Sequence, residues 1–205
     1  SNIQSKFIGG LRVTDEKIID IVESVLIDFN NDIVESLKKF GTDAVSIHTK
    51  KNNIIKVTPE TKELGFVGIP NKIDNNLIEK ILNKKQVPII SPLGLGNDNH
   101  PYNINGDTAA GAIAKSLKSR RLLLMTNVEG VLDKNKKLID EIFSLEILKM
   151  IEDNTITEGM IPKINTCLDA VNNGVTAVGI IDGRKQHSIL FEIFSDKGSG
   201  TLIRK

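Results

Sequence analysis

Short apolar runs alternate along the chain with segments whose apolar residues repeat at helical spacing. Leucine-rich or β-branched runs predict buried strands at 44–47, 87–91, 121–126 and 175–181, and a further strand at 189–194. Helical periodicity predicts helices at 14–24, 31–40, 75–82, 109–117, 145–151 and 163–172. Residues 50–69 interrupt the alternation and predict a peripheral β-hairpin with strands at 54–57 and 65–68.

Continuous apolar strands separated by helices are typical of a parallel sheet that is covered on both faces. We therefore predict an α/β fold, a three-layer αβα sandwich with a mainly parallel central sheet. A chain of 205 residues fits a single domain. Within residues 1–205 we expect two lobes, residues 1–93 and 94–205.

Charge and cysteine content narrow the range of partners. The chain has 27 basic and 26 acidic side chains, which gives no reason to propose nucleic acid or a membrane surface as a partner. No apolar run approaches the ~20 residues of a membrane span. Cys167 is the single cysteine, so an intrachain disulfide is excluded. It shares the apolar face of a predicted helix with Ile164 and Val171, which predicts a buried structural thiol.

Polar residues gather where an extended segment runs into a helix of small residues. Alternation places Asn103, Asn105 and Asp107 on one side of this segment, and open α/β sheets bind ligands at such junctions. Asp107 can hold lysines that bind phosphate, or it can simply cap the helix. Lys163 follows a glycine hinge at a helix start and can bind phosphate, or it can be a solvated residue of the first turn. Together these residues suggest phosphoryl transfer.

Several motifs, in this order along the chain, resemble those of N-acetylglutamate kinases, within the amino-acid kinase superfamily. The first is Gly10-Leu11-Arg12-Val13-Thr14-Asp15, which resembles their substrate-binding signature. The others begin at Gly65-Phe66-Val67-Gly68, Tyr102-Asn103-Ile104-Asn105-Gly106-Asp107, Val128-Glu129-Gly130-Val131-Leu132-Asp133, Gly159-Met160-Ile161-Pro162-Lys163, Ile181-Asp182-Gly183-Arg184 and Gly198-Ser199-Gly200-Thr201. The resemblance covers nearly the whole chain.

The resemblance implies ATP-dependent phosphorylation of the side-chain carboxylate of N-acetyl-L-glutamate, a step of arginine biosynthesis. Arg12 would bind a substrate carboxylate with its planar guanidinium, Asn103 would contact the substrate, and Asn105 would support it. Lys163 would neutralise the transferring phosphate, while Asp107 would orient lysine ammonium groups. The resemblance assigns nucleotide binding to Thr126, Asn127, Val128, Gly130, Val131, Leu132, Gly159 and Met160. Mg²⁺ would be carried by the phosphates of ATP.

By this resemblance, residues 1–93 would form the substrate-side lobe and residues 94–205 the nucleotide-side lobe. It also implies a homodimer or hexamer, L-arginine as an inhibitor, and a cytoplasmic or organellar location. The family's lysine-bearing first strand and Gly-Gly-Gly-Pro turn precede the Arg12 motif and do not occur in this sequence. Losing one preorganised donor typically costs ~10²–10³ in rate, so we expect the absence of several to nearly abolish turnover by the 205 residues alone.

Two other functions remain open at this point. One is a kinase for another acylated amino acid, since the shape of the pocket cannot be read from sequence. The other is a non-catalytic regulatory subunit that binds an amino acid or a nucleotide. Asn127, where the family commonly has aspartate, preserves size and hydrogen bonding.

Overall fold

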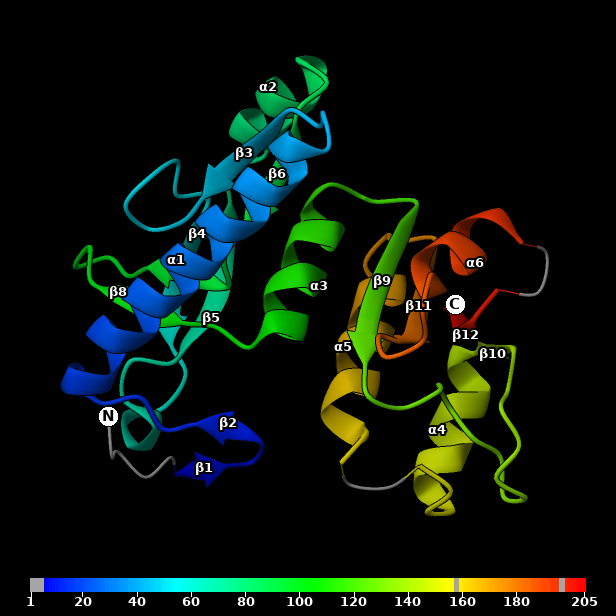
Figure 1. Ribbon diagram of the computed structural model, residues 1–205. Helices are drawn as coiled ribbons and strands as arrows, with labels where there is room; N and C mark the ends of the chain where they lie inside the picture. The colour runs from blue at the N-terminus through cyan, green and yellow to red at the C-terminus, as the bar shows by residue number, and fades with distance from the viewer. Residues whose placement is uncertain (1–5, 157–158, 196–197) are drawn as a thin grey trace. The chain divides into compact units, whose positions relative to one another are not determined.

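In the computed structural model, which describes residues 6–156, 159–195 and 198–205, the chain divides into two units, residues 1–109 and 110–205 (Figure 1). The division lies within helix α3 (Gly106–Ser116), whereas the sequence placed it at 93/94. Strand β7 (Leu93–Leu95) pairs in parallel with β4 (Ile55–Pro59), and this pairing keeps it in the first unit. The assignment of one part to substrate and the other to nucleotide stays a prediction.

The first unit contains a four-stranded sheet, a parallel pair of strands and a small hairpin. The sheet has the order β5-β4-β7-β8, with β5 at Gly68–Ile73 and β8 at Pro101–Asn103. Strands β3 (Ala44–Ile47) and β6 (Val87–Ile90) are parallel, and α2 (Asn75–Asn83) packs on β6. The hairpin pairs β1 (Phe7–Ile8) with β2 (Leu11–Arg12). A 3₁₀ turn at Lys62–Leu64 precedes β5.

Helix α1 (Glu16–Lys39) is continuous, so the expected pair of helices at 14–24 and 31–40 was wrong. Its N-cap is Asp15, whose carboxylate accepts hydrogen bonds from the backbone N–H groups of Lys17 and Ile18. The apparent break falls near Asn30, which is buried. The Asn30 side chain donates to the carbonyl of Ile89 at 2.8 Å, so its amide is satisfied by a strand that the sequence pattern could not connect to it.

The peripheral hairpin exists, with its second strand later than expected. Strand β4 pairs antiparallel with β5, which begins at Gly68, so a strand at 65–68 was wrong. Gly65 has φ +68°, outside the β region, and caps the 3₁₀ turn at Lys62–Leu64, so no strand begins there. Two residues of this segment form isolated β-bridges: Gly65 with Thr14 and Val67 with Asn103.

The second unit is a mixed sheet with helices on both faces. The sheet order is β10-β12-β11-β9, formed by Glu141–Phe143, Gly200–Arg204, Ala177–Asp182 and Arg121–Thr126. Val178 and Ile180 of β11 share a buried core with residues of α5 (Ile161–Asn172) and α4 (Ser144–Glu152). A Cβ on Gly179 would lie 3.3 Å from Glu192 of α6 (Ser188–Phe194). Val178 and Ile180 of β11 face α5, and Gly179 between them faces α6. Because alternate residues of a strand point to opposite faces, α5 and α6 cover opposite faces of this sheet.

This three-layer arrangement confirms the α/β class. Cys167 is fully buried in the core of the second unit, as expected. The predicted strand at 189–194 was wrong because these residues form α6. A short apolar run does not distinguish a strand from a helix by its period alone. No helix in the described ranges is long and apolar enough to cross a bilayer.

Candidate active site

Three motifs that lie far apart in the sequence meet at Thr14 in the first unit. Thr14 is fully buried, and its hydroxyl donates to the carbonyl of Arg12 at 3.0 Å. The Asn103 amide donates to the same hydroxyl oxygen at 3.5 Å. The backbone N–H of Phe66 donates to the Thr14 carbonyl at 2.7 Å, and the N–H of Asn103 donates to the carbonyl of Phe66 at 2.9 Å. Arg12, Phe66 and Asn103 are thereby linked through one threonine.

Gly65 is required for this junction. A Cβ at Gly65 would lie 2.4 Å from the Thr14 carbonyl oxygen, which is closer than real Cβ contacts. Thr14 is a residue that sequence reasoning missed, since its position before a helix suggested only helix initiation. Its place inside the Gly10–Asp15 motif was the available signal.

Arg12 lies on β2 with its side chain exposed. It faces Phe7 across the β1–β2 hairpin, and its guanidinium carbon lies 5.5 Å from the centre of the Phe7 ring. Gly9 and Gly10 both have positive φ, as a tight two-residue hairpin turn requires. The stacked ring limits the freedom of the guanidinium while leaving its N–H donors accessible to a carboxylate.

An aromatic cluster packs behind the same junction. The Phe66 ring stacks on His100 at 4.5 Å and lies 5.5 Å from the Tyr102 ring. Burial, followed by the nearby Asp98 carboxylate, raises the pKa of Tyr102. The Nδ1 atom of His100 is buried and has no hydrogen-bond partner among the described residues. His100 was also missed, because it lies outside the recognised motif.

The Asn103–Asp107 segment is not one extended strand. Only Asn103 lies in β8, and Asn105 accepts hydrogen bonds from the N–H groups of Asp107 and Thr108 at 3.0 and 3.2 Å. Asn105 therefore caps α3, and Asp107 lies in its first turn. The expectation that Asn103, Asn105 and Asp107 share one side of a strand was wrong, because the helix starts at Gly106.

A cavity of about 650 Å³ lies in the second unit, within the size range of small-molecule sites. It is lined by Val128, Gly130, Val131, Leu132, Asp133, Lys134, Lys136, Asp153, Asn154, Thr155, Ile156 and Met160. The predicted nucleotide residues Val128, Gly130, Val131, Leu132 and Met160 are thus brought together. The part of the predicted segment at 157–158 lies outside the described residues. The same predicted segment, Thr155 to Met160, also contributes Thr155 and Ile156 to the lining, whereas Asp153 and Asn154 just before it were not predicted.

An ion pair lies at the polar side of this cavity. The Lys134 ammonium is 2.8 Å from the Asp153 carboxylate. Hydrogen bonds from Lys134 and from the Thr155 hydroxyl lower the pKa of Asp153 to about 2. Apolar walls with a charged edge suit a flat heterocycle that carries polar substituents.

Thr126 is the last residue of β9, and Asn127 follows it. Thr126 is paired with Asp182 of the neighbouring parallel strand, and the N–H of Gly183 donates to the Thr126 carbonyl at 2.8 Å. Asp182 accepts two hydrogen bonds from the Arg184 guanidinium, at 2.9 and 2.8 Å. These bonds, together with one from the Arg184 N–H, lower the pKa of Asp182 to about 2. Thr126, Asn127 and Gly159 do not line the cavity.

Lys163 lies in the first turn of α5 and is half-buried. Met160 is the N-cap residue of the same helix, which connects Lys163 along the chain to the cavity wall. Asp107 belongs to the first unit and Lys163 to the second. Their cooperation stays a prediction. In the described part of the chain, no group of three or more His, Cys, Asp or Glu side chains is arranged to hold a metal ion.

Comparison with known proteins identifies related chains. The sequence profile of the amino acid kinase family matches residues 1–182. The acetylglutamate kinase of Pelagibacter ubique (strain HTCC1062) is 56% identical over 204 residues, which are 100% of this chain and 71% of that protein. The acetylglutamate kinase of Clostridioides difficile (strain 630) is 47% identical over 209 residues, covering 100% and 73%. The crystal structure of smu.665 from Streptococcus mutans UA159 is 32% identical, with a TM-score of 0.84, and the match covers 98% of this chain and 78% of that one.

Proposed function

The chain belongs to the amino acid kinase family, and we propose that it transfers the γ-phosphoryl group of ATP to the side-chain carboxylate of N-acetyl-L-glutamate. This reaction forms an acyl phosphate and belongs to arginine biosynthesis. Kinship with acetylglutamate kinases along the whole chain is the observation that carries the proposal. The convergence of three motif segments on Thr14 supports it from the structure.

The chemistry requires positioning rather than a general base. The attacking carboxylate is already ionised at neutral pH, so no proton has to be removed from it. One of its oxygens forms a bond to the γ-phosphorus, and the bond between that phosphorus and the bridging oxygen breaks. ADP leaves with the electron pair. The main obstacle is repulsion between two anions, which fixed cations and N–H donors reduce.

In the first unit, Arg12 and Asn103 are the proposed substrate contacts. The exposed guanidinium of Arg12 offers a bidentate site for a carboxylate. The Asn103 amide, which donates to the Thr14 hydroxyl, would also hydrogen-bond the substrate. Asn105 supports this site by starting α3 at a fixed residue.

In the second unit, the cavity walled by Val128, Val131 and Met160 is the proposed nucleotide site. Thr126 and Asn127, which do not line the cavity, would extend the site along the carboxyl ends of β9 and β11. Lys163, at the positive end of α5, would stabilise charge on the transferring phosphate, and Asp107 would orient lysine ammonium groups. Mg²⁺ would arrive with ATP on its phosphate oxygens.

Arg12→Gln tests the substrate site. We expect the KM for N-acetyl-L-glutamate to rise about 10- to 100-fold, since a charge-assisted bidentate contact is lost, while the KM for ATP stays within about twofold. The assay traps the acyl phosphate with hydroxylamine and follows ADP release, using the product of the complete reading frame that contains these residues. Lys39→Gln, at the exposed end of α1, serves as the control.

A substrate panel tests the activity itself. N-acetyl-L-glutamate should support hydroxamate formation, whereas N-acetyl-L-aspartate and free glutamate should not. A preference for another acylated amino acid would replace the proposed substrate, and binding of ATP without turnover would favour a regulatory subunit. Homo-oligomer formation, inhibition by L-arginine and a cytoplasmic or organellar location remain further predictions of the same proposal.

A further inference from the structure

Thr201 lies behind the wall of the proposed nucleotide cavity and does not line it. It belongs to β12, is fully buried, and pairs with Ile180 of β11. Its hydroxyl oxygen accepts a hydrogen bond from the backbone N–H of Val131 at 2.8 Å. Val131 is itself buried and lines the cavity. Because a buried N–H needs an acceptor, the Thr201 hydroxyl satisfies the Val131 backbone here.

The loop and the strand approach each other closely at this point. Gly130 has φ +150°, and a Cβ there would lie 2.5 Å from the Thr201 hydroxyl oxygen and 3.1 Å from its backbone nitrogen. The carbonyl of Val131 accepts a hydrogen bond from the N–H of Ile139 at 2.9 Å. The cavity wall is therefore held on one side by its own turn and on the other by Thr201.

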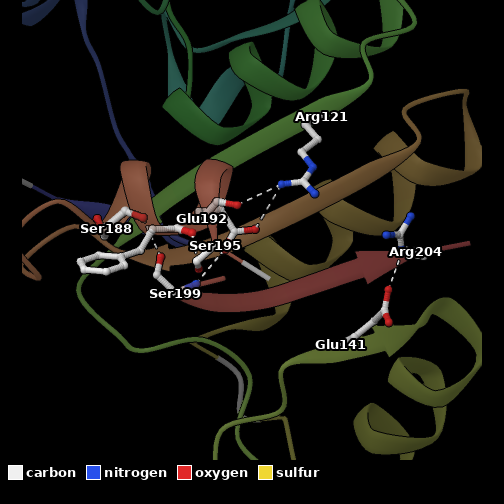
Figure 2. Close-up of polar contacts among 8 residues, drawn as sticks. Arg121, Glu141, Ser188, Glu192, Ser195, Ser199 and Arg204 are labelled. Carbon is white, nitrogen blue, oxygen red and sulfur yellow. Dashed lines mark hydrogen bonds and ion pairs between the residues drawn. The ribbon is translucent and has the colours of Figure 1, made fainter. Parts of the chain in front are cut away.

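A buried carboxylate fixes the start of β12 in turn (Figure 2). Glu192 of α6 accepts a hydrogen bond from the N–H of Ser199 at 2.9 Å, and the Ser199 hydroxyl donates to the carbonyl of Ser188 at 2.8 Å. Arg121 donates to the Glu192 carbonyl at 3.1 Å. A Cβ on Gly200 would lie 1.9 Å from the Ile180 carbonyl oxygen, so β12 also lies tightly against β11. Thr201 thus has a rigid support.

We propose that Thr201 is a positioning residue for the nucleotide, acting through the backbone of Gly130 and Val131. This inference rests on the proposed function, in which the cavity binds ATP. The hydroxyl holds the Val131 N–H and thereby sets the distance between the two apolar walls. Removing the acceptor leaves a buried donor unsatisfied, and the loop must move to reach another partner. Nucleotide affinity falls because the cavity is no longer formed in advance.

The test compares a substitution that removes the hydroxyl with one that keeps it. Thr201→Val removes the acceptor at nearly constant size, and we expect the Kd for MgATP, measured by calorimetry on the 205-residue chain, to rise about tenfold. Thr201→Ser keeps the acceptor, and its Kd should stay within about twofold of the original. Hydrogen exchange of the Val131 amide should be faster in the valine variant only. Thr201→Ala provides a second variant without the acceptor if the valine variant does not fold.

Ile203→Val is the matched stability control, because Ile203 is fully buried in the same strand but pairs with Val178 and Ile142 and does not line the cavity. It should lower the melting temperature without changing the Kd for MgATP. Equal MgATP affinity in the valine variant and the original chain would overturn the inference, as would equal weakening by Ile203→Val. Failure of the unsubstituted chain to bind MgATP would instead contradict the nucleotide site itself.

Discussion

Asp182 shows how a single neighbour sets the protonation of a residue near the proposed nucleotide site. The Arg184 guanidinium donates two hydrogen bonds to its carboxylate, which lowers the pKa of Asp182 to about 2. Because the folded pKa lies below the ordinary 3.8, the carboxylate contributes stability above pH 3.8. That contribution is lost as the pH falls towards 2.

Arg184→Gln should raise the pKa of Asp182 from about 2 towards 3.8, because the charged hydrogen-bond donors are removed. Carboxyl carbon NMR titration measures this value directly. Lys185→Gln is the control, since the Lys185 side chain affects the Asp182 carboxylate through a weaker charge interaction and its removal should change the pKa much less. An Asp182 pKa that stays near 2 in the glutamine variant would contradict the assigned cause.

Sequence reasoning at the residue scale found the side chains that carry recognisable chemistry. Val128 and Val131 were predicted in one segment and Met160 in another, and all three line one cavity. Thr14 and Thr201 were missed as supports, because their hydroxyls act on backbone groups far away in the sequence. Such bonds leave no local pattern, and only the folded backbone reveals them.

At the scale of elements, Gly65 decides whether the segment before β5 can reach Thr14. Gly65→Ala should lower the free energy of unfolding by about 3 kcal/mol, since the new Cβ combines positive φ with a backbone clash. Gly41→Ala should cost only about 1 kcal/mol, because Gly41 has φ +81° but open space around it. Denaturant unfolding measures both values.

The Gly65 variant should also raise the KM for N-acetyl-L-glutamate, because Asn103 and Thr14 are joined through the Phe66 backbone. The Gly41 variant should leave this KM unchanged. Equal losses of stability in the two variants would show that the close approach to Thr14 contributes nothing beyond the backbone conformation. Comparing the Gly65→Ala and Gly41→Ala variants therefore separates the cost of positive φ from the cost of the clash with Thr14.

Elements with a clear period and clear end signals were predicted well. The strands at 44–47 and 121–126 are present with those bounds, and α2 and α5 agree closely with the predicted helices. The failures at α1 and α6 have different origins. In α1, Asn30 is a polar residue buried within the helix, where a tertiary hydrogen bond satisfies it and overrides the local pattern. In α6, a short apolar run did not distinguish a helix from a strand.

At the scale of the whole molecule, the predicted division into two parts has a structural counterpart at a different residue. The sequence pattern marked the change near Gly94, because a glycine-rich segment begins there. Strand pairing of β7 with β4 and β8 keeps residues up to 109 in the first unit. Pairing between distant strands therefore set the boundary, and local composition could not reveal it.

Substitution of Lys163 tests whether the whole molecule performs phosphoryl transfer. Lys163→Ala should reduce kcat about 10²–10³-fold, since a fixed cation aimed at developing charge acts mainly in the transition state. The Kd values for MgATP and N-acetyl-L-glutamate should each change by less than about fivefold. Hydroxamate formation by the product of the complete reading frame gives kcat, and calorimetry gives the two Kd values.

Lys149→Ala, on the exposed face of α4, removes an equal charge from the same unit and should leave kcat unchanged. This comparison distinguishes a specific effect on the transferring phosphate from a general loss of positive potential. If Lys163→Ala weakened MgATP binding 100-fold and left kcat intact, Lys163 would bind the ground-state nucleotide, and another cation would have to stabilise the transition state. If both variants behaved alike, no stabilisation of the transferring phosphate could be assigned to Lys163.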